Sequence, residues 1–363
     1  MLSRQHILAL TFVPGITSDG IQSLIAANLS LDELLSLHDD DLLHLRLKGK
    51  TIRSMRDMRP YLDESDLQMR KAVEYGANII TLADSEYPPS LREIWSPPTV
   101  LYLQGTLMEA DRQAIAIVGT RSGSTYGRIA TEKYAEEFAR AGITVVSGLA
   151  RGIDTWAHKG TLRAGGRTLA VIASGLDRIQ PALSAQLAGE ISRSGGVISE
   201  YPFGTKALRP YFPQRNRIIS GITTATVLME SDLKGGGMIT ARFALDQNRE
   251  VFALPGPVNS PRSNGTNALI RTDRARLTQQ PEDVLDALGY HIPHPDRDRV
   301  ATLPDDLTVF EQMVCDHIAQ EPLHIDDLCE RSGLSPNDLL VTLLSLEFKG
   351  VVRQMAGRRF FRV

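Results

Sequence analysis

Apolar and polar positions follow different spacings in successive parts of the chain, and these changes predict its domains. Over residues 1–65, apolar residues recur every three or four positions, as in ILALTFVPGITSDGIQSLIAA and LSLDELLSL, which predicts short helices. Over residues 66–290, short β-branched runs alternate with helical stretches, an order typical of βαβ units. Residues 304–363 suggest three helices followed by two strand-like pieces, the order of a winged helix. Between them, residues 291–303 are rich in proline and charge, which predicts a linker.

The N-terminal helical segment contains a tight turn that has two interpretations. A second helix is expected to start at a cap, either Thr17 or Ser18. The turn before it, VPGI at 13–16, resembles a helix-hairpin-helix, in which glycine lets backbone N–H groups approach a phosphate. The alternative is a SAM-like helical domain for protein contacts with an ordinary glycine turn, because no basic side chains flank it.

The central segment carries seven apolar runs with strand character. They are NIITL, AIAIVG, ITVVSG, TLAVIASG, GVISE, ATVLME and EVFALPG, and most end in glycine or serine. In a doubly wound parallel sheet the carboxyl ends of the strands line one crevice, the usual ligand position. The predicted fold class is therefore α/β: a Rossmann-like, mostly parallel sheet core flanked by a small N-terminal helical domain and a C-terminal winged-helix domain.

Composition and charge narrow the function classes. The chain has 363 residues, of which 42% are hydrophobic and 23% charged, so it can bury a core. A net charge of −3 disfavours a globally basic nucleic-acid binder but permits a local basic patch. Cys315 and Cys329 lie in helical patterns without metal-ligand spacing and are expected to be buried thiols. No signal peptide or membrane-length apolar window is found, so the expected location is the cytoplasm.

A strand, a glycine-rich turn and a helix follow one another in AIAIVGTRSGSTYGRIATEKYAEEFARAG, an arrangement typical of anion sites. The turn lacks G-x-G-x-x-G, the next strand ends without an acid, and no Walker A motif occurs, so NAD and nucleoside triphosphates are disfavoured. Gly119 and Thr120 shape the turn, and Arg121 at its mouth can clamp a phosphate. The alternative for Arg121 is a solvated side chain.

Two further strand ends add candidates to the same crevice. SGLARGIDTWAHKG brings Arg151, together with Asp154 as a helix cap or a general base and His158 as a structural hydrogen bonder. MESDLKGGGMITARFAL brings Lys234 and Gly236, in a second backbone nest for anions. No nucleophile is matched with a base and no metal-ligand cluster is visible. The expected function therefore involves neither catalysis nor a cofactor.

The stretch PYFPQRNR places aromatic and basic residues among prolines. Pro210 and Pro213 are expected to prevent helix formation and to hold an exposed, stiffened loop. Exposed aromatics for bases and arginines for phosphates are a common solution for binding single-stranded nucleic acid. The alternative is a surface turn whose aromatics pack inward. The candidate DNA-binding residues in and beside this stretch are Arg209, Phe212, Arg215, Asn216 and Arg217.

The motifs AIVGTR, SGLARGID, ISEYPFG, FPQRNRIISG, GGGMITARFAL and EVFALPGPV, in this order, closely resemble the DprA (Smf) family of DNA-processing proteins. The resemblance covers roughly residues 66–290, and the flanking units match three-domain members. It implies a dimerising core that binds and protects single-stranded DNA and loads the RecA recombinase during natural transformation, without catalysis. Arg121 matches the arginine of the family's Gly-Ser/Ala-Arg signature, and Arg209 and Phe212 match basic and base-contacting positions. Thr120 and the Lys234-Gly-Gly-Gly turn depart from the family's usual residues.

Two rival functions belong to other classes. The first is a nucleotide-processing Rossmann enzyme of the lysine-decarboxylase-like superfamily, whose Pro-Gly-Gly-x-Gly-Thr-x-x-Glu site corresponds to GGGMITARFA here, without the acid. The second is a winged-helix transcription regulator. Its third helix, NDLLVTLLSLEFKG, offers few side chains that read bases, while positive charge collects in the hairpin, for example at Arg358 and Arg359.

Overall fold

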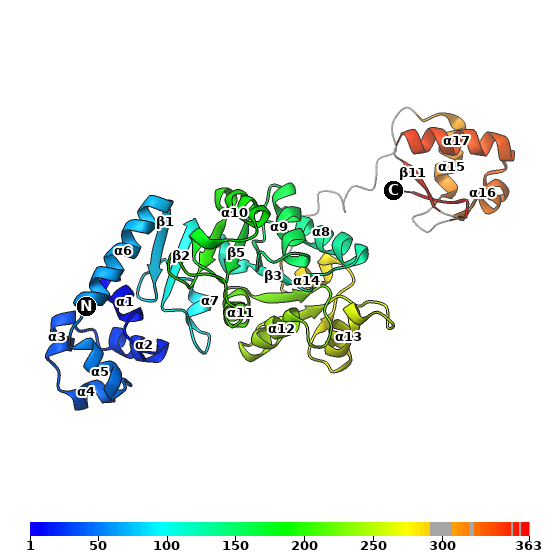
Figure 1. The fold of residues 1–363 in the computed structure, drawn as a ribbon. Helices are drawn as coiled ribbons and strands as arrows, with labels where there is room; N and C mark the ends of the chain where they lie inside the picture. Colours follow the sequence, from blue (N-terminus) through cyan, green and yellow to red (C-terminus); the bar gives the residue numbers. More distant parts are fainter. Residues whose placement is uncertain (291–306, 319–322, 350, 356, 363) are drawn as a thin grey trace. The chain divides into compact units, whose positions relative to one another are not determined.

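The computed structural model (Figure 1) describes residues 1–290, 307–318, 323–349, 351–355 and 357–362. The chain divides into two compact units, Met1–Tyr290 and His291–Val363. The linker expected at 291–303 lies outside the described residues. The expected boundary between residues 65 and 66 falls inside a continuous helix, α6 (Arg59–Tyr75), so it stays a prediction.

Short helices build the N-terminal part of the first unit, as their spacing predicts. Thr17 is the residue that caps the second of them, since its Oγ1 accepts a hydrogen bond from the N–H of Gly20 at 3.1 Å. The preceding turn contains Gly15 in the left-handed region, with φ +80°. Buried leucines such as Leu8 and Leu24 hold these helices together. The helices are α1 (Arg4–Thr11), α2 (Ser18–Ala26), α3 (Leu31–Ser36), α4 (Asp39–His44), α5 (Gly49–Met55) and α6.

A mostly parallel sheet forms the centre of the first unit, and it confirms the predicted fold class. Its strand order is β1-β2-β6-β5-β4-β3-β7-β8-β9. The seven strands from β6 to β9 in this order are parallel to one another, while β2 pairs antiparallel with both β1 and β6. Every residue of β3, β4 and β5 is buried, as expected for strands covered on both faces. The strands are β1 (Ala77–Thr81), β2 (Val100–Gly105), β3 (Ile115–Val118), β4 (Val145–Ser147), β5 (Thr168–Ile172), β6 (Gly196–Ser199), β7 (Ala225–Leu228), β8 (Glu250–Ala253) and β9 (Arg276–Leu277). The seven apolar runs correspond to all of these strands except β2 and β9.

Helices cover both faces of this sheet. Figure 1 shows α8, α9 and α10 along one face, and α11, α12 and α13 along the other. The helices of this part are α7 (Pro89–Arg92), α8 (Thr125–Arg140), α9 (Ile153–Arg163), α10 (Ala182–Ser194), α11 (Tyr211–Gly221), α12 (Gly236–Asp246), α13 (Asn264–Arg271) and α14 (Pro281–Ala287).

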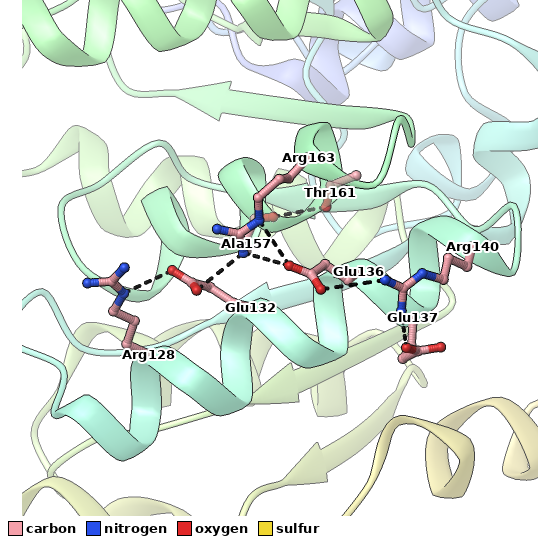
Figure 2. A network of polar contacts seen from close by, with 8 residues as sticks. All are labelled: Arg128, Glu132, Glu136, Glu137, Arg140, Ala157, Thr161 and Arg163. Atoms are coloured by element: carbon pink, nitrogen blue, oxygen red, sulfur yellow. Dashed lines mark hydrogen bonds and ion pairs between the residues drawn. The ribbon is translucent and has the colours of Figure 1, made fainter. Parts of the chain in front are cut away.

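Charged side chains connect α8 and α9 along their outer edges (Figure 2). The guanidinium of Arg163 on α9 lies 3.2 Å from a carboxylate oxygen of Glu132 and 2.6 Å from one of Glu136, both on α8. Arg128 and Arg140 continue the network along α8 itself. These arginines are more than half exposed, so each pair contributes little stability, about 0–1 kcal/mol.

The stretch PYFPQRNR is helical, and the prediction of an exposed loop is wrong. Helix α11 begins at Tyr211, with Pro210 immediately before it and Pro213 in its first turn. The N–H groups of a first turn have no partner within the helix, so prolines there remove no hydrogen bond. The buried face of this helix includes Arg215, Ile218 and Ile219, and Ile222 directly after the helix is buried too.

The second unit is the predicted winged helix. Its strands pair in the order β10-β12-β11. Ser335 caps the third helix, as expected, by accepting a hydrogen bond from the N–H of Asp338. Cys315 is buried as predicted, whereas Cys329 is half-buried. The elements are α15 (Val309–His317), β10 (Leu323–His324), α16 (Ile325–Ser332), α17 (Pro336–Phe348), β11 (Val352–Met355) and β12 (Arg359–Arg362). No helix in the described ranges combines the length and apolarity of a membrane span.

Candidate nucleic-acid interface

The strand order creates a crevice at the carboxyl ends of β3 and β7. The chain proceeds from β3 through β4, β5 and β6 towards one edge of the sheet, and β7 then returns to the other side of β3. The loops that follow β3 and β7 therefore leave in opposite directions, and ligands bind at such a switch point. The first loop runs from Gly119 to Ser124 and the second from Met229 to Gly235.

The turn after β3 is fixed by close backbone contacts. The N–H of Thr120 donates to the carbonyl oxygen of Glu230 at 2.8 Å. Gly152, which precedes α9, has φ +87°, and a Cβ there would lie 2.5 Å from the carbonyl oxygen of Thr120. Only glycine fits this approach without moving the turn. The exposed side chain of Arg121 is therefore presented by a preformed loop.

Arg121 and Phe212 form the centre of the crevice. The guanidinium carbon of Arg121 lies 4.9 Å from the centroid of the Phe212 ring, a cation–π contact between the β3 loop and the first turn of α11. Phe212 is half-buried, and Arg121 is exposed. A guanidinium stacked on a ring still has N–H groups in its own plane that can donate to a phosphate.

Two cavities flank this pair, and both include Arg121, Ala150, Phe212 and Arg215 in their walls. We call them together the groove. The first cavity, of about 410 Å³, is also lined by Gly119, Thr120, Asn216, Gly235, Gly236 and Gly237. The second, of about 430 Å³, is also lined by Arg151, Ser174, Gln180, Ser184 and Ala207. The groove thus combines one glycine-rich side with one side of mixed polarity.

Arg215 lies at the base of the groove and is 4% exposed. Its Nη1 donates to the carbonyl oxygen of Gly148 at 2.6 Å and to that of Val171, so it connects the ends of β4 and β5. A Cβ on Gly148 would meet both Arg215 Nη1 and Asp154 Oδ2, so the guanidinium and the carboxyl group are buried close together beside this glycine. Burial lowers the pKa of Arg215 to about 10, against the opposing attraction of Asp154. Arg215 is still charged at neutral pH.

Asp154 and His158 support the loop after β4 from within α9. Asp154 lies in the first turn of the helix, and its Oδ2 accepts from the N–H of Ala150 at 3.3 Å; Gly152 is the residue at the cap position. Burial raises the pKa of Asp154, although Arg215 acts against the shift. His158 is fully buried, with Nδ1 2.7 Å from Thr168 Oγ1. Because that hydroxyl donates its proton to a backbone carbonyl, Nδ1 of His158 is the donor.

His158 is held neutral in the folded protein. Burial lowers the pKa of its imidazole to about 3, and the nearby charge of Arg215 adds to the shift. A neutral ring bonded to a threonine fits the structural role that the sequence suggested, and nothing in its contacts prepares it for proton transfer to a ligand.

The groove gathers eight of the eleven predicted DNA-binding residues: Gly119, Thr120, Arg121, Arg151, Phe212, Arg215, Asn216 and Gly236. Arg209 is exposed on the segment before α11, and Lys234 lines a separate cavity of about 540 Å³ over α12 and α13. The side chain of Arg217 is 15% exposed and pairs with Glu200. Arg215 and Arg217 therefore do not lie on an exposed loop, because the helix directs them into internal contacts.

The predicted set of DNA-binding residues left out several residues of this region. Tyr201 and Tyr211 stack with ring centroids 4.3 Å apart, and the hydroxyl of Tyr201 lies 3.2 Å from Oε1 of Gln214. Gln180 and Ser184 line the second cavity without belonging to any motif. Their positions depend on how β6 and α10 pack, which no local pattern records. The helical spacing of Arg215 with Ile218 and Ile219 was the one available signal that this arginine is buried.

The fold and the groove define a class of protein. It has a Rossmann-like core, whose groove contains arginines and glycine-rich turns, followed in the chain by a winged helix. The profile of the family described as DNA recombination-mediator protein A matches residues 78–289, and that of the DprA winged helix domain matches residues 300–358. The chain belongs to the DprA (Smf) family, a family of recombination mediators.

Relatives support this assignment along most of the chain. Protein Smf of Escherichia coli (strain K12) is 36% identical over 330 residues, covering 87% of this chain and 86% of that protein. DNA processing protein DprA of Bacillus subtilis (strain 168) is 40% identical over 217 residues, covering 59% and 72%. The X-ray structure of DprA from Streptococcus pneumoniae superposes with a TM-score of 0.68 at 31% identity, covering 78% of this chain and 97% of that one.

A further solved structure is that of DNA processing protein A from Helicobacter pylori, a protein described as having a unique single-stranded DNA binding mode. It superposes with a TM-score of 0.54 at 28% identity and covers 59% of this chain and 97% of that one. The ligand described for that protein is therefore single-stranded DNA.

Proposed function

We propose that the protein binds single-stranded DNA in the groove and acts as a recombination mediator without catalysing a reaction. The observation that supports this most directly is the pair formed by Arg121 and Phe212, in which a guanidinium lies over an aromatic ring beside a preformed turn. The relative from Helicobacter pylori is described as a binder of the same ligand. Aromatic platforms combined with basic groups suit single strands, whose bases are free to stack.

The groove suggests a division of roles among its residues. Arg121 would bind a phosphate, with Arg151 as a second exposed cation on the neighbouring loop. The N-terminus of α12, where Gly236 has open space around its Cα, would donate backbone N–H groups to another phosphate. Phe212 would stack on a base, and Asn216 would offer an amide to its edge. Arg215 would position the groove from beneath rather than contact DNA.

The family suggests the wider role. In this proposal the protein forms a homodimer, protects incoming DNA and loads the RecA recombinase in the cytoplasm during natural transformation. A direct test is RecA-driven strand exchange on oligonucleotides coated with single-strand-binding protein. Faster RecA assembly in the presence of this protein is expected, and no acceleration would contradict the loading role.

The DNA-binding proposal is tested by fluorescence anisotropy of labelled oligo-dT, with duplex of equal length as comparator, over a salt series. With three to five phosphates neutralised, the log–log salt slope should be about −2 to −3.5, since each phosphate on a single strand contributes about −0.7. Equal affinity for duplex and single strand, or ATP hydrolysis above background, would contradict it.

A further inference from the structure

Glu230 is a buried carboxylate that the proposed binding of DNA does not use. It follows β7 and is 3% exposed. Its Oε2 accepts from the N–H of Ser124 at 2.8 Å, and its Oε1 accepts from the hydroxyl of Ser124 at 2.6 Å. Its backbone carbonyl also accepts from Thr120, so one residue holds both ends of the turn between β3 and α8.

The carboxylate occupies the N-terminus of α8, where Ser124 is the cap residue. In Rossmann-like nucleotide-binding proteins the first glycine turn leads to a helix whose N-terminus receives a phosphate. Here a Cβ on Gly127 would lie 2.2 Å from Oε2 of Glu230. Glycine at this position therefore leaves room for the protein's own carboxylate, at the point where a bound phosphate would otherwise approach.

We propose that Glu230 is a built-in substitute for a phosphate, which closes the N-terminus of α8 to free nucleotides. Two anions cannot share one helix N-terminus, because like charges at such short distance repel strongly. The N-terminus of α12 across the crevice stays open, since nothing lies within 4 Å of a Cβ on Gly236. The selectivity that follows, for a polynucleotide over free nucleotides, rests on the proposed function; the closure itself does not.

The closure is tested by thermal unfolding of the full-length wild type, Glu230→Ala and Glu230→Gln. Each is measured in inorganic phosphate, in formate, and in sodium chloride at matched ionic strength. Alanine opens the space at the helix N-terminus, whereas glutamine fills it without the charge. Glu230→Ala should unfold at a lower temperature in chloride and should recover as phosphate or formate is added, because a ligand of the folded state stabilises it by mass action. Wild type and Glu230→Gln should gain less from these anions than Glu230→Ala, because only the groove is then open to an anion.

A folded Glu230→Ala variant without this anion-specific recovery would overturn the proposal, because a purely structural cap predicts loss of stability alone. If Glu230→Ala does not fold in any buffer, Glu230→Ser is measured in the same way, because serine also leaves room at the N-terminus of α8. A gain in unfolding temperature from phosphate or formate no larger than that of the wild type would then refute the closure, and a larger gain would support it.

The selectivity is tested by adding dTMP to complexes of labelled oligo-dT. At the same dTMP concentration, Glu230→Ala should lose severalfold more affinity for oligo-dT than the wild type, because dTMP also enters the opened site. Equal sensitivity of the two proteins would overturn the selectivity. If the wild type does not bind oligo-dT at all, the proposed function fails, while the thermal measurements still decide whether Glu230 closes the site.

Discussion

The groove of the core and the exposed face of the C-terminal unit are the two candidate surfaces for nucleic acid, and they are built differently. In the groove, Arg121 stands on a turn fixed by glycine contacts and stacks on Phe212. In the C-terminal unit, Arg359 is exposed on the hairpin. The outward face of α17, the helix that would enter a DNA groove, exposes Leu340, Val341 and Leu344 by 49%, 70% and 56%.

This difference favours the groove as the site for single strands, because its arginine is held in place before DNA binds. A side chain ordered before binding loses less conformational entropy when the ligand arrives. Apolar side chains on α17 cannot donate hydrogen bonds to base edges, which winged helices that read sequence require. We therefore expect the core to carry the affinity for single strands.

The largest effect is expected from replacing Arg215, which lies beneath the groove. Arg215→Ala should lower the free energy of unfolding of the core by about 3–5 kcal/mol, because it leaves the carboxylate of Asp154 buried without its opposing charge. The measurement is urea unfolding followed by tryptophan fluorescence. Both tryptophans of the chain, Trp95 and Trp156, lie in the first unit, so the signal reports on the core.

The matched control is Arg359→Ala, which should leave this transition unchanged. Adding Asp154→Ala to Arg215→Ala should restore part of the lost stability, since both buried charges are then gone. If Arg215→Ala unfolds at the wild-type urea concentration yet binds oligo-dT poorly, then Arg215 contacts DNA directly and the positioning role is wrong.

The next effect sharpens the comparison between the two surfaces. Arg121→Ala should weaken oligo-dT binding by about 1.5–3 kcal/mol, the range for hydrogen bonds to charged groups. The salt slope should flatten by about 0.7, because one phosphate contact is lost. Arg359→Ala should cost much less, since its exposed charge is screened by salt. Equal losses in the two folded variants at matched salt would break the comparison.

Phe212→Ala separates stacking from charge within the groove. It should cost about 1–3 kcal/mol in oligo-dT affinity, the range for base–aromatic stacking. The salt slope should stay close to that of the wild type, since no phosphate contact is removed. Because Phe212 is half-buried, the melting temperature is measured in parallel. A variant that melts several degrees lower but binds normally would show that the ring is architectural.

Acid should destabilise the core through His158. The unfolded imidazole takes up a proton below a pKa of about 6.5, whereas the buried ring stays neutral down to about 3. The unfolded state therefore binds more protons, and the free energy of unfolding should fall by about 1.5 kcal/mol between pH 6.5 and pH 5. His158→Gln, which can still bond to Thr168, should show a flatter dependence over this range. An unchanged dependence would mean that another group titrates.

Features that depend on neighbouring residues in the chain could be predicted from the sequence. Buried parallel strands are continuous apolar runs, so β3, β4 and β5 could be found, and Arg121 could be found because its turn is rich in glycine. The helix α11 was missed because proline usually breaks helices, although it is tolerated in a first turn. The burial of Arg215 depends on carbonyl groups of Gly148 and Val171, which are distant in sequence. Such contacts exist only once the sheet has assembled.

The smallest effect on affinity is expected from removing the C-terminal unit. Deletion of residues 304–363 should change oligo-dT affinity by less than tenfold, about 1.4 kcal/mol. The groove residues all belong to the first unit, and the core there is compact by itself. Anisotropy at matched salt measures the loss, and unfolding of the truncated protein by tryptophan fluorescence checks that its core is intact. A larger loss with an intact core would assign the main site to the winged helix, and the preformed turn at Arg121 would then serve another purpose.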